Sequence, residues 1–205
     1  MESVAHNISD KPETVPVSPV RLRSLFGGHP ASIHVQYTEE SLTRVTSATI
    51  GEKIARTATR LPGVSRDSKV VDAFAGIGGN AIRFAYYFNT VHATEVDPQL
   101  RGMLRSNIEA FDMLNKVFVH DGYYQDLPVA QTTPTILFLD PNWSDDMGNN
   151  YRDDHRVRIS VPAPGDMMTP IEDVIANARA RYVIVKLPVN YDLAHMERII
   201  GSRCH

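Results

Sequence analysis

A glycine-rich turn at residues 70–80, VVDAFAGIGGN, holds the residue types best suited to bind a small charged ligand. It follows an apolar run, Lys69–Phe74, that predicts a strand, and it opens a predicted helix. Gly76 and Gly78 lack a Cβ, so the backbone there can pass close to a ligand. Asp72 ends the strand, where its carboxylate would repel a pyrophosphate and attract an ammonium group. The turn therefore favours the methionine end of S-adenosylmethionine over a dinucleotide; a tight turn without a ligand is the alternative.

Acidic residues follow the next two predicted strands, Thr90–Val96 and Val117–His120. Glu95 stands about 20 positions after the glycine turn, the spacing at which a carboxylate accepts hydrogen bonds from a ribose diol. Asp97 instead suits the cap of the following helix, which begins with a proline. Asp121 is placed to face an adenine ring. The alternative for Glu95 and Asp97 is that they merely end a strand.

The motif DPNW, Asp140 to Trp143, comes directly after a fourth apolar strand, Thr135–Leu139. This position is the carboxyl edge of the sheet, where open α/β sheets bind ligands. The Asp140 carboxylate and the Pro141 carbonyl are acceptors that could orient a planar amine, and proline stiffens the turn. Trp143 offers a flat, electron-rich face, and we expect it to be exposed and to stack on a base. A core tryptophan is the alternative.

Strands and helices alternate along the chain, which predicts a parallel sheet covered on both faces. Tyr182–Leu187 is the fifth predicted strand. The predicted helices are Thr38–Arg60, Asn80–Phe88, Gln99–Phe111 and Ile171–Ala180. The pattern indicates a doubly wound, Rossmann-like α/β fold with the strand order 3-2-1-4-5.

Two stretches lie outside this alternation. Residues 1–37 contain prolines among polar residues and predict an extended or partly ordered N-terminal segment, so we place the catalytic domain at 38–205. A long polar segment, Ser144–Met168, separates the fourth strand from the last predicted helix. A loop of that length in a compact domain is usually functional or disordered.

The composition narrows the class of protein. The chain has 205 residues and a net charge of −3, so it has no general basic field for holding a long polyanion. Its single cysteine allows no disulfide framework, and its histidines show no metal-ligand spacing. No apolar run approaches the roughly 20 residues that span a bilayer. We expect a soluble protein of the nucleus or cytoplasm with no metal and no membrane partner.

At these motifs the sequence resembles the trimethylguanosine synthase family, which methylates N2 of the 7-methylguanosine cap of RNA. The family pattern is V-V-D-A-F-C-G-x-G-G-N, then D-x-D-P, then S-P-P-W. In this chain the three motifs read VVDAFAGIGGN, EVDP and DPNW. Upstream, residues 45–55, VTSATIGEKIA, resemble the family's V-T-P-E-x-I-A segment. The resemblance implies a class I methyltransferase fold, S-adenosylmethionine as the cofactor, and the capped 5′ end of an RNA as the partner.

The resemblance also implies roles by position. The cofactor-binding residues would be Asp72, Phe74, Gly76, Gly78, Asn80, Glu95 and Asp121. The catalytic motif would be Asp140, Pro141, Asn142 and Trp143, with Trp143 stacking on the cationic 7-methylguanine. Candidate contacts to the cap phosphates are Arg21, Arg23, Lys53 and Arg56, for which solvated surface charge is the alternative.

The chain departs from the family pattern at two places. Asn142 replaces the second proline and Asp140 replaces the serine, which alters the acceptors around the target amine. The sequence also ends soon after the fifth strand, where this fold class has two more strands. Either the fold is a truncated or minimal version that lacks these strands, or a partner chain or an oligomer covers the strand-five edge. Two other functions remain open: methylation of another amine, such as adenine N6 or a protein amine, and cap binding without catalysis.

Overall fold

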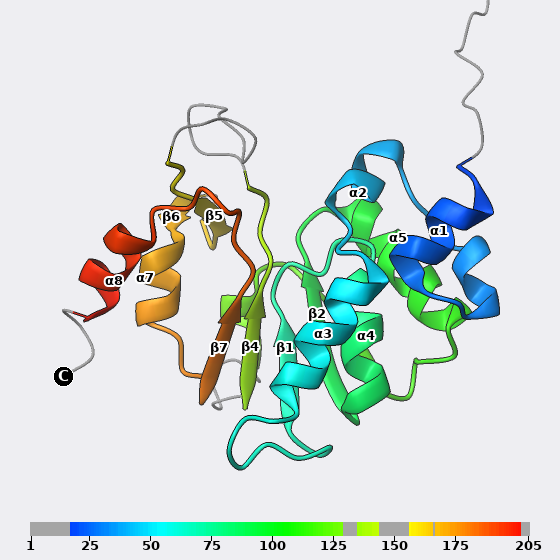
Figure 1. Cartoon of the computed structure of the whole chain (residues 1–205), viewed down its shortest axis with the longest axis horizontal. Helices are drawn as coiled ribbons and strands as arrows, with labels where there is room; N and C mark the ends of the chain where they lie inside the picture. The colour runs from blue at the N-terminus through cyan, green and yellow to red at the C-terminus, as the bar shows by residue number, and fades with distance from the viewer. Residues whose placement is uncertain (1–16, 129–134, 144–155, 166, 202–205) are drawn as a thin grey trace, which may run out of the picture.

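The computed structural model describes residues 17–128, 135–143, 156–165 and 167–201. Its centre is a five-stranded sheet with the order β3-β2-β1-β4-β7 (Figure 1). The strands are β1 (Lys69–Asp72), β2 (Thr90–Glu95), β3 (Val117–Asp121), β4 (Ile136–Leu139) and β7 (Tyr182–Val185). All neighbours pair in parallel, and β7 is the strand predicted as the fifth. The predicted fold class and strand order are therefore confirmed.

Both faces of the sheet are covered, as the apolar strands require. Consecutive residues of β1 point to opposite faces: Val70 belongs to one buried cluster and Val71 to the other. The first face packs on α3 (Ala48–Ala58), α4 (Gly79–Tyr87) and α5 (Pro98–Ala110), and the second on α7 (Ile171–Ala176) and α8 (Leu193–Gly201). Figure 1 shows the two groups of helices on either side of the strands.

The described part of the N-terminal segment joins the first of these cores. Helix α1 (Pro19–Phe26) begins at Ser18, whose side chain accepts a hydrogen bond from the Arg21 amide, and a short 3-10 helix, η1 (Pro30–Ile33), follows. Phe26 is fully buried among the residues that pack on the sheet. The region from α1 onward therefore belongs to the same core as the residues after 37, while residues 1–16 lie outside the described residues.

The continuous helical pattern predicted over 38–60 is wrong in one respect. The structure has two helices there, α2 (Glu39–Arg44), which is closed by a capping box at Thr38, and α3. Val45 between them is extended, with φ −66° and ψ 125°. The break matters because it brings Thr46 to the carboxyl end of β4, where the Thr46 hydroxyl donates to Asp140.

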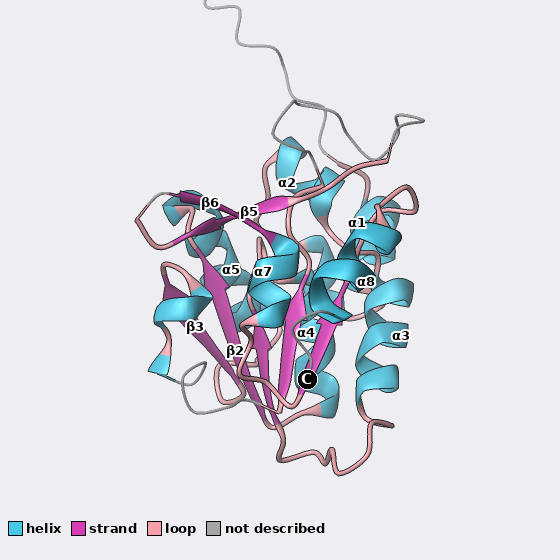
Figure 2. Ribbon diagram, turned by 90° about the vertical axis from the view of Figure 1, so that its left-hand side faces the viewer, coloured by secondary structure: helices cyan, strands magenta, loops and turns pink. Residues whose placement is uncertain are grey.

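The polar segment predicted as a loop over 144–168 contains a hairpin, which corrects that prediction. Strands β5 (Ser160–Ala163) and β6 (Met167–Pro170) pair antiparallel, with Pro162 opposite Met168. Val161 is fully buried and anchors the hairpin in the second core. Figure 2 shows the hairpin across one end of the main sheet. Residues 144–155 and 166 of the segment lie outside the described residues.

The remaining differences lie near the C-terminal half. The helix predicted over 171–180 ends at Ala176, and α8 was not predicted. Within the described ranges β7 pairs only with β4, and the prediction that another chain covers its free edge stays a prediction. Among the helices the structure describes, none is long and apolar enough to cross a membrane.

Candidate functional site

The glycine turn between β1 and α4 leaves open space at one position. Gly78 caps α4 with φ +102°, and a Cβ there would lie 2.9 Å from the Leu104 side chain. A Cβ on Gly79 would lie 2.8 Å from Val45. Gly76 also has a positive φ, +53°, but a Cβ there would meet nothing within 4 Å. Gly78 and Gly79 thus serve packing, whereas Gly76 borders space that a ligand can enter.

Asp72, at the end of β1, is a fully buried carboxyl group without a hydrogen-bond partner on either oxygen among the described residues. Burial raises the pKa of Asp72 to about 8, and the negative charges of Asp140 and Glu95 add to the rise. The nearby backbone amides of Phe74 and Ala81 oppose it only in part. Such a group is costly unless something pairs with it. An ammonium group of a ligand would supply the missing charge and donors.

Glu95 lies at the end of β2 and closes the other side of the same turn. One carboxylate oxygen accepts a hydrogen bond of 2.9 Å from the Gly76 amide, and the other accepts one of 2.9 Å from the Asp97 amide. Burial raises the pKa of Glu95, and these amide contacts oppose the rise. The side chain is therefore fixed by the turn while each oxygen keeps capacity for a further donor, as the predicted ribose contact requires.

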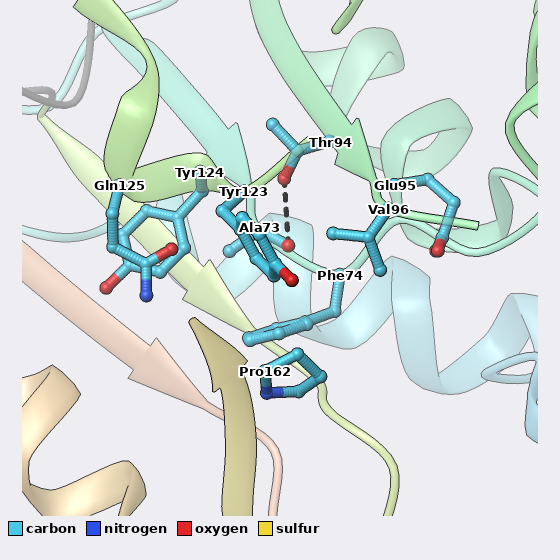
Figure 3. Close-up of a pocket in the computed structure, with 9 residues that line it drawn as sticks. All are labelled: Ala73, Phe74, Thr94, Glu95, Val96, Tyr123, Tyr124, Gln125 and Pro162. Carbon is cyan, nitrogen blue, oxygen red and sulfur yellow. Dashed lines mark hydrogen bonds between the residues drawn. The ribbon is translucent and has the colours of Figure 1, made fainter. Parts of the chain in front are cut away.

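A pocket opens between the ends of β1 and β2 and the hairpin (Figure 3). The ring of Phe74 lies beside Pro162 of the hairpin, and Thr94 donates a hydrogen bond of 2.8 Å to the Ala73 carbonyl. The lining residues are Ala73, Phe74, Thr94, Glu95, Val96, Tyr123, Tyr124, Gln125 and Pro162. The predicted residues Phe74 and Glu95 thus meet in one small, open and mostly apolar pocket with aromatic walls.

Sequence reasoning missed the tyrosines and the hairpin proline of this pocket. Tyr124 opens a short 3-10 helix, η2 (Tyr124–Asp126), and its ring packs edge-on against Phe74 with centroids 6.4 Å apart. The pair of tyrosines directly after β3 was a usable signal, because that position is also at the carboxyl edge. Pro162 gave no signal, since its hairpin was not predicted.

Asp121 does not line the pocket. Its carboxylate pairs with Arg105 at 2.7 Å and with Arg101 at 3.0 Å, and its side chain is 68% exposed. Both arginines come from α5, which turns the acid away from the expected adenine position. The predicted adenine contact therefore stays a prediction that this geometry does not support. Asp97 takes its expected alternative role, because its side chain accepts from the Gln99 and Leu100 amides at the start of α5.

A second set of contacts surrounds Asp140 at the end of β4. One of its oxygens accepts hydrogen bonds from the Thr46 hydroxyl at 2.7 Å and the Asn80 amide at 3.0 Å. The Lys186 ammonium lies 3.0 and 3.2 Å from the two oxygens. Asn80, predicted beside the cofactor, thus also holds the Asp140 carboxylate. Neither Thr46 nor Lys186 was predicted, although a lysine at the end of an apolar strand was a visible signal.

Trp143 is half-buried against the second core, so the prediction of an exposed indole is wrong. Its Nε1 donates to the Lys186 carbonyl at 3.2 Å, and the Lys186 ammonium lies 4.1 Å from the ring centroid. Pro141 is buried and Asn142 is exposed. The turn therefore fixes the indole at the carboxyl edge, with one residue, Lys186, holding both its edge and its ring.

The basic candidates for cap phosphates lie on two packed helices. All four side chains, Arg21 and Arg23 of α1 and Lys53 and Arg56 of α3, are exposed. From the start of α3 at Ala48, Lys53 lies about 7.5 Å and Arg56 about 12 Å along the helix, at about 1.5 Å per residue. Their role stays a prediction. Within the described ranges no group of three or more histidine, cysteine or acidic side chains could hold a metal ion.

Two curated proteins are distantly similar to this chain. A protein of Acanthamoeba polyphaga mimivirus without an assigned function is 28% identical over 124 residues, 60% of this chain and 47% of that protein. The trimethylguanosine synthase of Schizosaccharomyces pombe is 27% identical over 135 residues, 62% of this chain and 53% of the relative. The chain thus spans about half the length of these curated relatives.

Solved structures give weaker likenesses. A putative methyltransferase of Porphyromonas gingivalis has a TM-score of 0.48 and 22% identity, covering 60% of this chain and 30% of that one. Trm5 of Methanocaldococcus jannaschii in complex with adenosine has a TM-score of 0.40 and 19% identity, covering 54% and 31%.

A family model described as RNA cap guanine-N2 methyltransferase matches residues 67–202. The matched range contains all five strands of the sheet, the Asp72 turn, Glu95 and the Asp140–Trp143 motif. It covers well over half of the chain, and the chain therefore belongs to the RNA cap guanine-N2 methyltransferase family.

Proposed function

We propose that this chain binds S-adenosylmethionine at the β1–β2 end of the sheet and methylates N2 of the 7-methylguanosine cap of an RNA. The observation that carries the proposal is Asp72, a buried carboxyl whose oxygens have no hydrogen-bond partner among the described residues, beside the open turn at Gly76. A zwitterionic ligand with a nucleoside fits this arrangement, because an ammonium group would pair with Asp72 and the nucleoside would enter the neighbouring apolar pocket. The family match supports the cap as the methyl acceptor.

Each end of the cofactor would have its own residues. Asp72 would hold the ammonium group, and the open turn at Gly76 would let the methionine backbone approach. Glu95 would accept hydrogen bonds from the ribose, and Phe74 and Tyr123 would flank the adenine. When bound, S-adenosylmethionine supplies a methyl group already activated by its positive sulfonium.

The protein's part in the reaction would be alignment and exclusion of water. Asp140 is held by Thr46, Asn80 and Lys186, so its oxygens are fixed acceptors for an amine. The Pro141 carbonyl would be a second acceptor. Trp143 would stack on the base, where the positive charge of 7-methylguanine adds a cation–π attraction.

The test is a methyl-transfer assay with RNAs that differ only in their cap. We expect incorporation into RNA capped with 7-methylguanosine and little into the same RNA capped with guanosine. Asp140→Asn keeps the shape of the side chain and should lower the rate without preventing binding of S-adenosylhomocysteine. Incorporation into uncapped RNA would instead favour methylation of another amine, such as adenine N6. Binding of both ligands without any transfer would favour a cap-binding module.

A further inference from the structure

Lys186 occupies the acceptor side of the site with its own positive charge. It directly follows β7, and its backbone amide donates to the Leu139 carbonyl at 2.8 Å, so its main chain is fixed to β4. Its ammonium lies within 3.2 Å of both Asp140 oxygens and 4.1 Å from the centroid of the Trp143 ring. The lysine side chain is 19% exposed and the Asp140 side chain 7%. The ion pair is thus largely shielded from water, with a flexible stem on the lysine side.

These two contacts are the ones that a cationic, amine-bearing base would make. Such a base carries N–H groups, which a carboxylate accepts, and a positive charge, which an indole face attracts. The Lys186 ammonium presents both features to Asp140 and Trp143 from within the chain. Two positive charges repel each other in a shielded site. The Lys186 ammonium and a cationic base therefore cannot both contact Asp140 and Trp143 without weakening each other's binding.

We propose that Lys186 makes an autoinhibitory contact in the acceptor site, as an internal cation that an incoming base must displace. This inference rests on the proposed function, because it takes the acceptor to be a base. A neutral base that displaced the ammonium would not restore the positive charge beside Asp140 and Trp143. A cationic base such as 7-methylguanine restores it. Lys186 therefore weakens the binding of every base, and it weakens that of a cationic base most, because the displaced ammonium still repels a second positive charge nearby.

The experiment measures the affinity of 7-methylguanosine and guanosine for the wild type and two variants. Nucleosides are used because a triphosphate would respond by itself to a lost positive charge. Lys186→Met removes the charge. Lys186→Gln also removes it but keeps an N–H donor for Asp140, so it serves if the methionine variant does not fold. Lys69→Met is the matched control, since Lys69 begins β1 at the opposite end of the sheet.

We expect both Lys186 variants to bind 7-methylguanosine about 2- to 30-fold more tightly than the wild type, the range of a cation–π contact. Guanosine should gain less, because it has no charge to be repelled. Lys69→Met should leave both affinities unchanged. S-adenosylhomocysteine binding and thermal unfolding check that each variant is folded.

Two results would overturn the inference. One is that folded Lys186 variants bind 7-methylguanosine no more tightly than the wild type, which would make Lys186 a binding residue or a purely structural partner of Asp140. The other is an equal gain for guanosine, which would remove the role of charge. If either result is found and the wild type still methylates capped RNA, only the inference about Lys186 is wrong. If neither the wild type nor any variant binds either nucleoside or transfers a methyl group, the proposed function is wrong as well.

Discussion

The two halves of the site differ in how their charged groups are paired. At the ends of β1 and β2, Asp72 is buried with no hydrogen-bond partner among the described residues, and the turn at Gly76 faces open space. At the ends of β4 and β7, Asp140 is held by three side chains and Trp143 is covered by Lys186. The first half is built around a charge that the protein does not supply, whereas the second half supplies its own.

The difference teaches what each half requires of its ligand. An unpaired buried carboxyl lowers the stability of the ligand-free protein, and it raises the affinity for any ligand that carries the missing charge. A carboxylate that is already paired adds to the affinity for a ligand only if the ligand replaces the internal partner. We therefore expect the donor half to bind its ligand strongly and the acceptor half to bind its ligand weakly.

The largest expected effect is that of Asp72→Asn on donor binding. Removing one partner of a buried ion pair costs about 3–5 kcal/mol, so affinity for S-adenosylhomocysteine should fall roughly 100-fold or more. Titration calorimetry measures it. Asp97→Asn is the matched control, because Asp97 caps α5 and asparagine caps equally well. Equal affinity of wild type and Asp72→Asn would show that Asp72 does not contact the ligand.

Trp143→Ala should act on the other half. Base–aromatic stacking is worth about 1–3 kcal/mol, so affinity for 7-methylguanosine should fall roughly 5- to 100-fold while donor binding changes little. Trp143→Phe should lie between, since it keeps a ring but loses the hydrogen bond to the Lys186 carbonyl. Trp143 is the chain's single tryptophan, so its fluorescence should be quenched by 7-methylguanosine. Unchanged emission with a large loss of stability in Trp143→Ala would identify a purely structural residue.

The raised pKa of Asp72 predicts a pH dependence with opposite signs for stability and binding. Between the ordinary value of 3.8 and about 8, the folded protein holds a proton that the unfolded chain has released. Stability should therefore fall as pH rises through this window. Binding an ammonium group needs the carboxylate, so it releases that proton, and donor affinity should rise by about tenfold per pH unit until about pH 8.

Calorimetry in two buffers of different ionisation enthalpy counts the released protons. About one should be released well below pH 8 and few above it, and Asp72→Asn should abolish the effect. Donor affinity that is flat across the window would mean that Asp72 is already ionised in the free protein.

The smallest effect should come from Asp121→Asn. Its ion pairs with Arg101 and Arg105 are exposed, and such pairs contribute about 0–1 kcal/mol. Thermal unfolding should change little, and so should donor affinity. A loss of S-adenosylhomocysteine affinity above tenfold would instead restore the predicted adenine contact and mean that the acid turns inward when the ligand binds.

The sequence predicted the sheet because each strand is a short apolar run between turn residues, and parallel strands with crossover helices permit few orders. Asp72, Gly76 and Glu95 were predicted as site residues because they stand at or just after the carboxyl ends of two neighbouring strands, β1 and β2. Asp121 was placed correctly along the chain, but the direction of its side chain depends on two arginines of α5, Arg101 and Arg105, which lie about one helical turn apart. The pairing of Lys186 with Asp140 and Trp143 joins residues more than 40 positions apart, and no local pattern encodes it. The position of the hairpin that brings Pro162 to the pocket is likewise not encoded by a local sequence pattern.

The most direct test of the account is the identity of the methylated nucleoside. Wild-type protein is incubated with S-adenosylmethionine and an RNA capped with 7-methylguanosine, and the digested nucleosides are separated and identified by mass spectrometry. The account predicts that the cap nucleoside gains a methyl group on N2 and that the internal adenosines gain none. A methyl group on adenine N6, or an unmodified cap with a protein that binds S-adenosylhomocysteine, would contradict it.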